Sequence, residues 1–152
     1  MSAHRFAVVP AAYVYLRRGD DVLLQRRQNT GYMDGTWAAA AAGHVELGET
    51  AAAAGAREAA EELDITIPQA ALTPLTVMQR TDGTAAAIEQ RVDWFFTASS
   101  WSGTPRIMEP GKCAEIAWFP LRGLPDAMPA YERVVLDAFA ESTLQPLTNY
   151  GF

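Results

Sequence analysis

The chain has 152 residues, of which 49% are hydrophobic and 20% charged, a composition typical of a folded globular protein. Its net charge of −6 and its lack of a dense lysine and arginine run argue against a surface that follows the phosphates of a nucleic acid polymer. No apolar stretch approaches the roughly 20 residues of a membrane span, so we expect no membrane partner.

The length suits one domain over residues 1–152, large enough to bury a core but too short for two ordinary domains. Cys113 is the single cysteine, so no intramolecular disulfide can form. Together with the absence of a signal peptide pattern, this predicts a reducing, cytoplasmic setting. We expect a monomer or a homodimer.

Two strands joined by a polar turn are predicted at the start of the chain. Residues 6–16 are rich in β-branched and aromatic residues, and the polar turn of residues 17–21 leads into a second strand over residues 22–27. Pro10 cannot donate to a ladder, so we expect it at an edge, at a bulge or before the strand. Arg26 and Arg27 are candidates to bind a substrate phosphate, and the equal alternative is a solubilising strand end.

A loop over residues 29–36 is predicted from its glycines and its turn-forming Asn and Asp. Trp37 and the alanines after it then predict one strand that ends at Gly43 and His44. Trp37 is a candidate to line a base pocket, although a tryptophan in this setting more often packs in the core. We expect His44 to be a loop residue rather than a catalytic base.

A helix is predicted to begin after Thr50, its N-cap, and to continue through an alanine-rich segment. Gly55 weakens the helix by roughly 1 kcal/mol relative to alanine, and it allows a neighbouring strand to approach closely. Asp64 stands where helices often end in a left-handed residue, a conformation that aspartate tolerates better than most.

Three carboxylates of this helix share one face. Glu58, Glu61 and Glu62 are three or four residues apart, and Arg57 lies one turn before Glu61. Because like charges at this spacing repel, a cation would stabilise the face, and oxygen ligands favour Mg²⁺ or Mn²⁺. The alternative is a solvated helix face, which for this short segment alone is the commoner explanation.

Further along the chain, residues 72–81 and 90–98 predict a second hairpin, in which Val92, Trp94 and Phe96 share a face. Arg80 and Arg91 are further phosphate candidates, although each is more often a surface charge.

Residues 113–120 predict a strand, and residues 131–139 predict a helix. The apolar stripe expected on this helix consists of Val134, Val135, Ala138 and Phe139. The tail after Glu141 carries no clear signal.

The acidic helix and the loop before it carry a longer pattern of fixed spacing. It consists of Gly43, Glu49, Arg57, Glu58, Glu61, Glu62 and Ile65. This pattern resembles the signature of the Nudix hydrolases and is far more specific than a lone glycine motif. The sequence departs from it at Ala59, where a large aliphatic residue is usual, and at Asp64, where glycine is usual.

The resemblance implies an α/β fold, a Nudix-like α/β/α sandwich with a mixed β-sheet. It implies that Mg²⁺ or Mn²⁺ is bound by Glu58, Glu61, Glu62 and the carbonyl group of Gly43. Arg57, with Glu49, would orient the carboxylates. The implied reaction is metal-dependent hydrolysis of a pyrophosphate bond in a nucleoside diphosphate linked to another moiety.

The general base is expected to be Glu58. Members of this family use either a glutamate of the signature or one on a later loop, and Glu109 and Glu115 are the nearest such candidates. For Glu109, an ordinary loop charge before a proline is the commoner explanation.

The expected substrate is a nucleoside triphosphate, because residues 109–113, followed by Trp118, resemble a segment of nucleotide-directed Nudix proteins. ADP-ribose or a dinucleotide is the second possibility. A non-catalytic nucleotide-sensing module would be expected to lack a signature carboxylate, and this chain keeps all four glutamates. An isomerase of isoprenoid diphosphates is also compatible with the fold, since fold alone does not decide function.

Overall fold

The computed structural model describes residues 4–152 and contains one mixed sheet of eight strands. The strands are β1 (Val9–Arg18), β2 (Asp21–Arg27), β3 (Trp37–Ala39), β4 (Ala41–His44), β5 (Thr73–Arg80), β6 (Arg91–Ala98), β7 (Cys113–Pro120) and β8 (Leu147–Tyr150). The order is β3-β2-β1-β6-β5-β8, with β4 paired to β1 and β7 to β2. Two short 3₁₀ helices, η1 (Gln69–Ala71) and η2 (Ala87–Glu89), lie in the connections.

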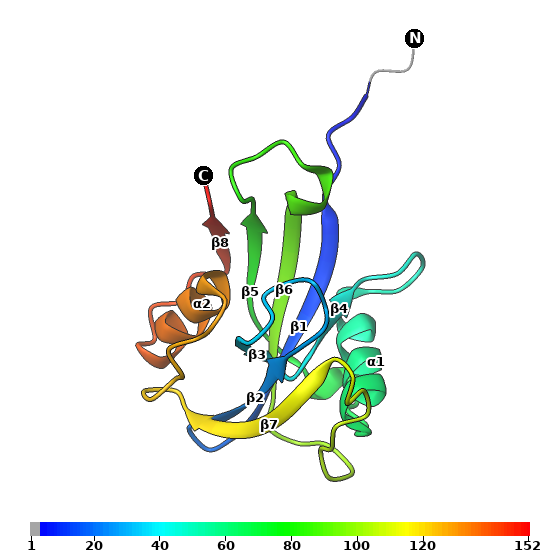
Figure 1. Ribbon diagram of the computed structural model, residues 1–152, viewed down its shortest axis with the longest axis vertical. Coiled ribbons are helices and arrows are strands. Elements are labelled where there is room, and N and C mark those ends of the chain that lie inside the picture. Colours follow the sequence, from blue (N-terminus) through cyan, green and yellow to red (C-terminus); the bar gives the residue numbers. More distant parts are fainter. Residues whose placement is uncertain (1–3) are drawn as a thin grey trace.

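Helices α1 (Ala51–Leu63) and α2 (Ala130–Ala140) lie on opposite sides of the sheet (Figure 1). The central strand β1 explains this arrangement, because its side chains alternate between two cores. Tyr13 and Tyr15 belong to the core that α2 covers, whereas Val14 and Leu16 belong to the core that α1 covers. The α/β/α sandwich with a mixed sheet is therefore confirmed. Neither helix, nor any other in the described part of the chain, is long and apolar enough to cross a membrane.

Both predicted hairpins are present. Strands β1 and β2 pair antiparallel at Arg17 with Val22 and at Arg18 with Asp21, so β1 extends into the segment predicted as a turn. Strands β5 and β6 pair antiparallel along their length. Strand β1 also runs parallel to β6, which makes it the centre of the sheet.

Two strand predictions need correction. The single strand expected from Trp37 to His44 is two strands, because β3 pairs with β2 whereas β4 pairs with β1. The tail after Glu141, which carries no sequence signal, contains β8, parallel to β5. Strand β8 has only four residues and is held by its pairing with β5, so its own sequence contains little to reveal it.

The buried face of α2 differs from the predicted apolar stripe. Val134 is 46% exposed, whereas Tyr131, Glu132, Val135 and Leu136 are buried. Because an apolar pattern cannot include Glu132, the sequence predicts the buried face of α2 one position away from where it lies.

Helix α1 begins and ends as predicted. The Thr50 hydroxyl accepts a hydrogen bond from the Ala53 N–H at 3.1 Å, and Asp64 ends the helix in a left-handed conformation with φ 56°. A Cβ atom at Gly55 would lie 2.9 Å from Cγ2 of Val14, so this glycine lets α1 pack closely on β1. That close packing brings the acidic face of α1 against β4.

Candidate active site

Arg57 is the centre of an ion-pair network between α1 and the loop that precedes it. Its guanidinium donates to Glu49 at 2.8 and 3.1 Å, to Glu58 at 2.9 Å and to Glu61 at 3.2 Å. It also donates to the carbonyl oxygen of His44 at 3.1 Å, which ties the loop before α1 to the helix. The hydrogen bonds from Arg57 lower the pKa of Glu49.

Glu58 and Glu62 point from α1 towards β4. The Glu62 carboxylate accepts a hydrogen bond from the Ala42 N–H at 2.8 Å, and the Glu58 carboxylate occupies the space that a Cβ atom would need at Gly43. Only glycine at position 43 leaves room for this carboxylate. Burial raises the pKa of Glu62 to about 8 and raises the pKa of Glu58, and neighbouring carboxylates add to both effects.

These two carboxylates line a cavity of about 360 Å³, here called the carboxylate cavity. Its walls include Gln25, Arg27, Glu58, Glu62, Glu109 and Lys112. The structure thus brings Glu58, Glu62 and Gly43 together, because Gly43 also lines this cavity. Glu61 lies apart from it, with its side chain 54% exposed and paired to Arg57.

Glu109 reaches the carboxylate cavity because its loop is attached to the end of α1. The backbone N–H groups of Arg106 and Met108 donate to the carbonyl oxygens of Leu63 and Glu62, at 3.0 and 3.3 Å. From the sequence, an ordinary loop charge is the commoner explanation for Glu109. The sequence could not reveal its place at the cavity, because the attachment links residues far apart in the chain. Glu115, the other candidate base, is exposed on β7.

The donor atoms of this site suit a hard divalent cation. Within residues 4–152, no three Asp, Glu, His or Cys side chains form a ready-made metal site. The hydrogen bonds explain this, because Arg57 holds Glu58 and Glu61 while the Ala42 N–H holds Glu62. Even so, the donors on the cavity wall are carboxylate oxygens, which hard divalent cations prefer.

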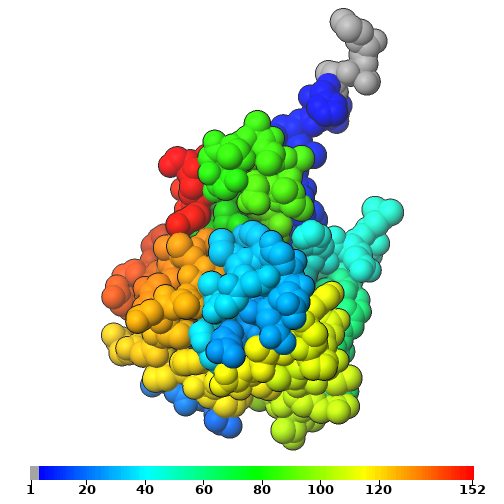
Figure 2. All heavy atoms as spheres, viewed as in Figure 1, coloured from blue at the N-terminus to red at the C-terminus, as the bar shows by residue number. Residues whose placement is uncertain are grey.

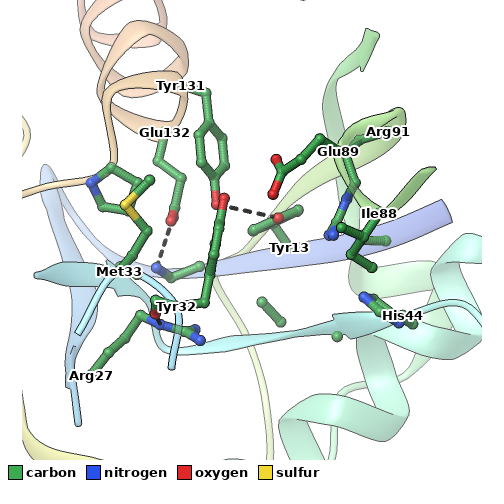
Figure 3. Close-up of a pocket in the computed structure, with 16 residues that line it drawn as sticks. Tyr13, Arg27, Tyr32, Met33, His44, Ile88, Glu89, Arg91, Tyr131 and Glu132 are labelled. Carbon is green, nitrogen blue, oxygen red and sulfur yellow. Dashed lines mark hydrogen bonds between the residues drawn. The ribbon is translucent and has the colours of Figure 1, made fainter. Parts of the chain in front are cut away.

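A second cavity, of about 320 Å³, adjoins the first. This tyrosine cavity is lined by Tyr13, Tyr32, Met33, Tyr131, Glu132 and His44, among others (Figure 3). Arg27, Ala42 and Gly43 line both cavities, so the two share a wall. Strands β1, β3 and β4, the segment around η2, the start of α2 and the loop of residues 28–36 all contribute to this lining. Figure 2 shows that loop, in blue, on the surface between the green segment around η2 and the yellow strand β7.

Arg80, which the sequence offers as a phosphate candidate, lies behind the tyrosine cavity and is not among the residues that line either cavity. It is only 5% exposed, and its guanidinium donates to Asp93 at 2.7 Å. It also donates to the hydroxyls of Tyr32 and Tyr13, at 3.2 and 3.4 Å, and lies 3.7 Å from the ring centre of Tyr131. Arg80 therefore holds three tyrosines of the cavity in place.

Of the other three residues predicted to contact substrate, one lines the cavities and two do not. Arg27 lines both cavities and donates to the Tyr32 carbonyl oxygen at 3.0 Å. Arg26 is exposed and lines neither, because adjacent strand residues point to opposite faces. Trp37 also lies outside both cavities and packs edge-on against Phe119, with ring centres 4.8 Å apart.

Glu132 is a charged lining residue that the sequence did not indicate, as it did not indicate the tyrosines of this cavity. It is 1% exposed, although it is charged and lies in the first turn of α2. The available signal was its spacing from Val135 and Leu136, three and four residues later, which places it on their buried face.

Comparison with solved structures gives several close matches. A MutT NUDIX hydrolase from Burkholderia pseudomallei matches with a TM-score of 0.76 and 28% identity, over 86% of this chain and 97% of that one. The mMutator MutT protein from Bacillus halodurans matches with a TM-score of 0.71 and 18% identity, over 94% and 90% of the two chains. A UDP-X diphosphatase matches with a TM-score of 0.67 and 16% identity, over 97% and 69%. The latter two likenesses show the fold alone.

A search of the curated proteins found no match. The NUDIX domain family, in contrast, matches residues 7–139, which is most of the chain. Members of this family generally need divalent metal ions and cleave pyrophosphate bonds in nucleoside diphosphate derivatives. With the signature residues, the sandwich fold and this match in agreement, the chain belongs to the Nudix family and is a Nudix pyrophosphohydrolase.

Proposed function

We propose that this protein hydrolyses a pyrophosphate bond of a nucleoside triphosphate, with Mg²⁺ or Mn²⁺ as cofactor. The observation that carries the proposal is the shared wall between the carboxylate cavity and the tyrosine cavity. A nucleotide has a charged phosphate chain and a planar base at opposite ends. The two cavities match these ends, since one is lined by carboxylates that suit a cation and the other by aromatic rings.

In this proposal Glu58 and Glu62 hold the cation, together with the Gly43 carbonyl oxygen. When bound, the cation polarises a phosphoryl oxygen and lowers the pKa of a water molecule. Arg57 and Glu49 keep the loop before α1 attached to the helix, through their hydrogen bonds of 2.8 and 3.1 Å. For Glu61 to join the ligands, its carboxylate would have to leave Arg57.

Glu58 is our choice for the residue that accepts the proton of the attacking water. Its carboxylate lies in the carboxylate cavity beside Glu62, where the cation and its water molecule would bind. Glu109 is the alternative, because it lines the same cavity from the opposite loop. Arg27, which lines both cavities, is placed to contact the phosphate chain between the two.

The choice of a triphosphate rests on residues 109–113. This segment resembles that of nucleotide-directed relatives, and Glu109, Lys112 and Cys113 lie at the carboxylate cavity. Lys112 adds a positive charge beside the place expected for the phosphates. ADP-ribose or another linked nucleotide remains the second candidate.

The test is a hydrolysis assay over nucleoside triphosphates, ADP-ribose, dinucleoside polyphosphates and nucleotide sugars, with Mg²⁺, with Mn²⁺ and with excess chelator. We expect activity on at least one triphosphate and none with chelator. Turnover that persists in excess chelator would exclude the mechanism, and activity confined to ADP-ribose would exclude the substrate.

Substitution tests the roles of Glu58 and Glu62. Glu58→Gln or Glu62→Gln should lower the rate at least about a hundredfold, because each removes a charged ligand, whereas Glu115→Gln, exposed on β7, should keep the parental rate. Without metal, both variants should melt at the parental temperature or slightly above it, because each substitution removes repulsion between carboxylates. If both instead unfold the metal-free protein, the residues form a structural network.

A further inference from the structure

The carboxyl group of Glu132 is buried at one wall of the tyrosine cavity, and only one of its oxygens is hydrogen-bonded. Oε1 accepts from the Tyr15 hydroxyl at 2.6 Å and from the Ala39 N–H at 2.8 Å. Oε2 receives no hydrogen bond from residues 4–152. Figure 3 shows the side chain extending from α2 towards the cavity floor, with its bond to Ala39.

The same carboxyl group has no ion-pair partner in the described part of the chain. The nearby guanidinium of Arg27 is directed to the Tyr32 carbonyl oxygen and the Thr30 hydroxyl instead, at 3.0 and 3.2 Å. Oε2 therefore reaches the cavity without a protein donor, and a ligand in the cavity can supply the missing hydrogen bond.

The two hydrogen bonds to Oε1 hold the carboxyl group in one orientation, so in the ionised carboxylate Oε2 is a fixed acceptor. Around it, the rings of Tyr13, Tyr32 and Tyr131 suit a planar group. A ring with an N–H donor at its edge would satisfy Oε2, whereas a ring with a keto oxygen there would leave two acceptors facing each other.

We propose that Glu132 determines base specificity, and that its free oxygen selects a nucleobase that carries an exocyclic amino group over its keto counterpart. This inference rests on the proposed function, since it places the base of the nucleotide in the tyrosine cavity. Cytosine and uracil differ at this group and at the adjacent ring nitrogen, as do adenine and hypoxanthine. Guanine differs from hypoxanthine by an amino group at another edge.

The experiment compares matched pairs in two ways. The first is kcat/KM for CTP against UTP, ATP against ITP and GTP against ITP. The second is calorimetric binding of CMP, UMP, AMP, IMP and GMP to the metal-free protein, which needs no hydrolysis. We expect the parent to favour the amino member of at least one pair by about tenfold or more in both measurements.

Glu132→Gln provides the decisive variant. Its amide oxygen would accept the bonds from Tyr15 and Ala39, so its NH₂ group would face the cavity as a donor. The amino preference should then vanish or reverse. Asp137→Asn is the matched control, because it removes a carboxylate from the exposed face of α2 and should keep the parental ratios.

The outcomes distinguish a failure of the role of Glu132 from a failure of the proposed function. A parent without an amino preference in any pair, or a Glu132→Gln variant that keeps the parental ratios, overturns the role of Glu132 alone. If the parent cleaves ADP-ribose but no triphosphate, the proposed function fails, and the role of Glu132 is decided by the monophosphate binding ratios. If Glu132→Gln does not fold, the parental ratios still decide the inference.

Discussion

Arg80 shows how the surroundings of one residue decide its role. In the sequence it is a phosphate candidate, but in the folded protein its guanidinium lies between Asp93 and the tyrosine cavity, without access to the carboxylate cavity. A buried charge of this kind depends on its ion-pair partner and on the polar groups and rings around it.

We therefore expect Arg80→Met to lower the free energy of unfolding by about 3 to 5 kcal/mol, because buried Asp93 would lose its hydrogen-bonded cation and keep only Arg91, at 3.8 Å. Denaturant unfolding measures this. Arg26→Met, at an exposed position, should change the stability by less than about 0.5 kcal/mol. An Arg80→Met variant with parental stability and a raised KM for nucleotide would restore the phosphate role.

Asp64 combines a left-handed backbone with a surface ion pair. Glycine would relieve the backbone by up to about 1 kcal/mol, but it would also remove the 2.9 Å bond from Arg106, worth about 0 to 1 kcal/mol between such exposed groups. The two effects nearly cancel, so Asp64→Gly alone should be close to neutral.

The backbone effect of Asp64→Gly should become visible when Arg106 is first replaced by alanine. In that background, Asp64→Gly should stabilise by up to about 1 kcal/mol in thermal or denaturant unfolding. A clear loss of stability there would mean that the Asp64 side chain has a further partner.

At the scale of elements, the contact between α1 and β1 is what positions the acidic face of the helix. Gly55 allows this contact, and the loop over residues 101–112 then attaches to the carbonyl end of α1 and delivers Glu109. The helix, β4 and this loop together form the carboxylate cavity.

Gly55→Ala tests that contact. In an open helix position the change should stabilise by about 1 kcal/mol, but here the new Cβ would lie 2.9 Å from Val14, so we expect a loss of about 1 to 3 kcal/mol. Ala60→Gly, at an exposed position of the same helix, should cost about 1 kcal/mol from propensity alone. A more stable Gly55→Ala protein would show that the helix can move away from β1.

At the scale of the whole molecule, burial of Glu132 makes the free energy of unfolding depend on pH. Burial raises the pKa of Glu132 from 4.5 to about 7. A carboxyl whose pKa is raised by folding binds its proton more tightly in the folded state. Its contribution to stability is therefore fully present below about pH 4.5 and is lost as the pH rises to about 7.

In the metal-free protein we expect Glu132→Gln to remove this loss, which amounts to about 3 kcal/mol between pH 4.5 and above pH 7, at about 1.4 kcal/mol per pH unit. The measurement is denaturant unfolding of parent and variant at several pH values. Glu62, whose pKa is also raised, is present in both proteins, so its contribution cancels in the difference. Parallel curves for the two proteins would contradict a buried, titrating Glu132.

Local chemistry made much of this protein predictable from its sequence. The strands of both hairpins, the Thr50 cap and the left-handed Asp64 depend on residues close together in the chain, and the structure confirms them. The spacing of the signature residues likewise indicated the family, and it placed Glu58, Glu62 and Gly43 where the structure brings them together.

Only the tertiary structure decided the rest, because it depends on contacts between distant segments. Strand β8 is held by pairing with β5, and Glu109 reaches its cavity through the end of α1. Whether Arg80 and Glu132 face solvent or the interior depends on which helix and strand cover them. Charge alone suggests the surface, and the fold buries both because Asp93 neutralises Arg80, whereas Tyr15 and Ala39 supply donors to Glu132.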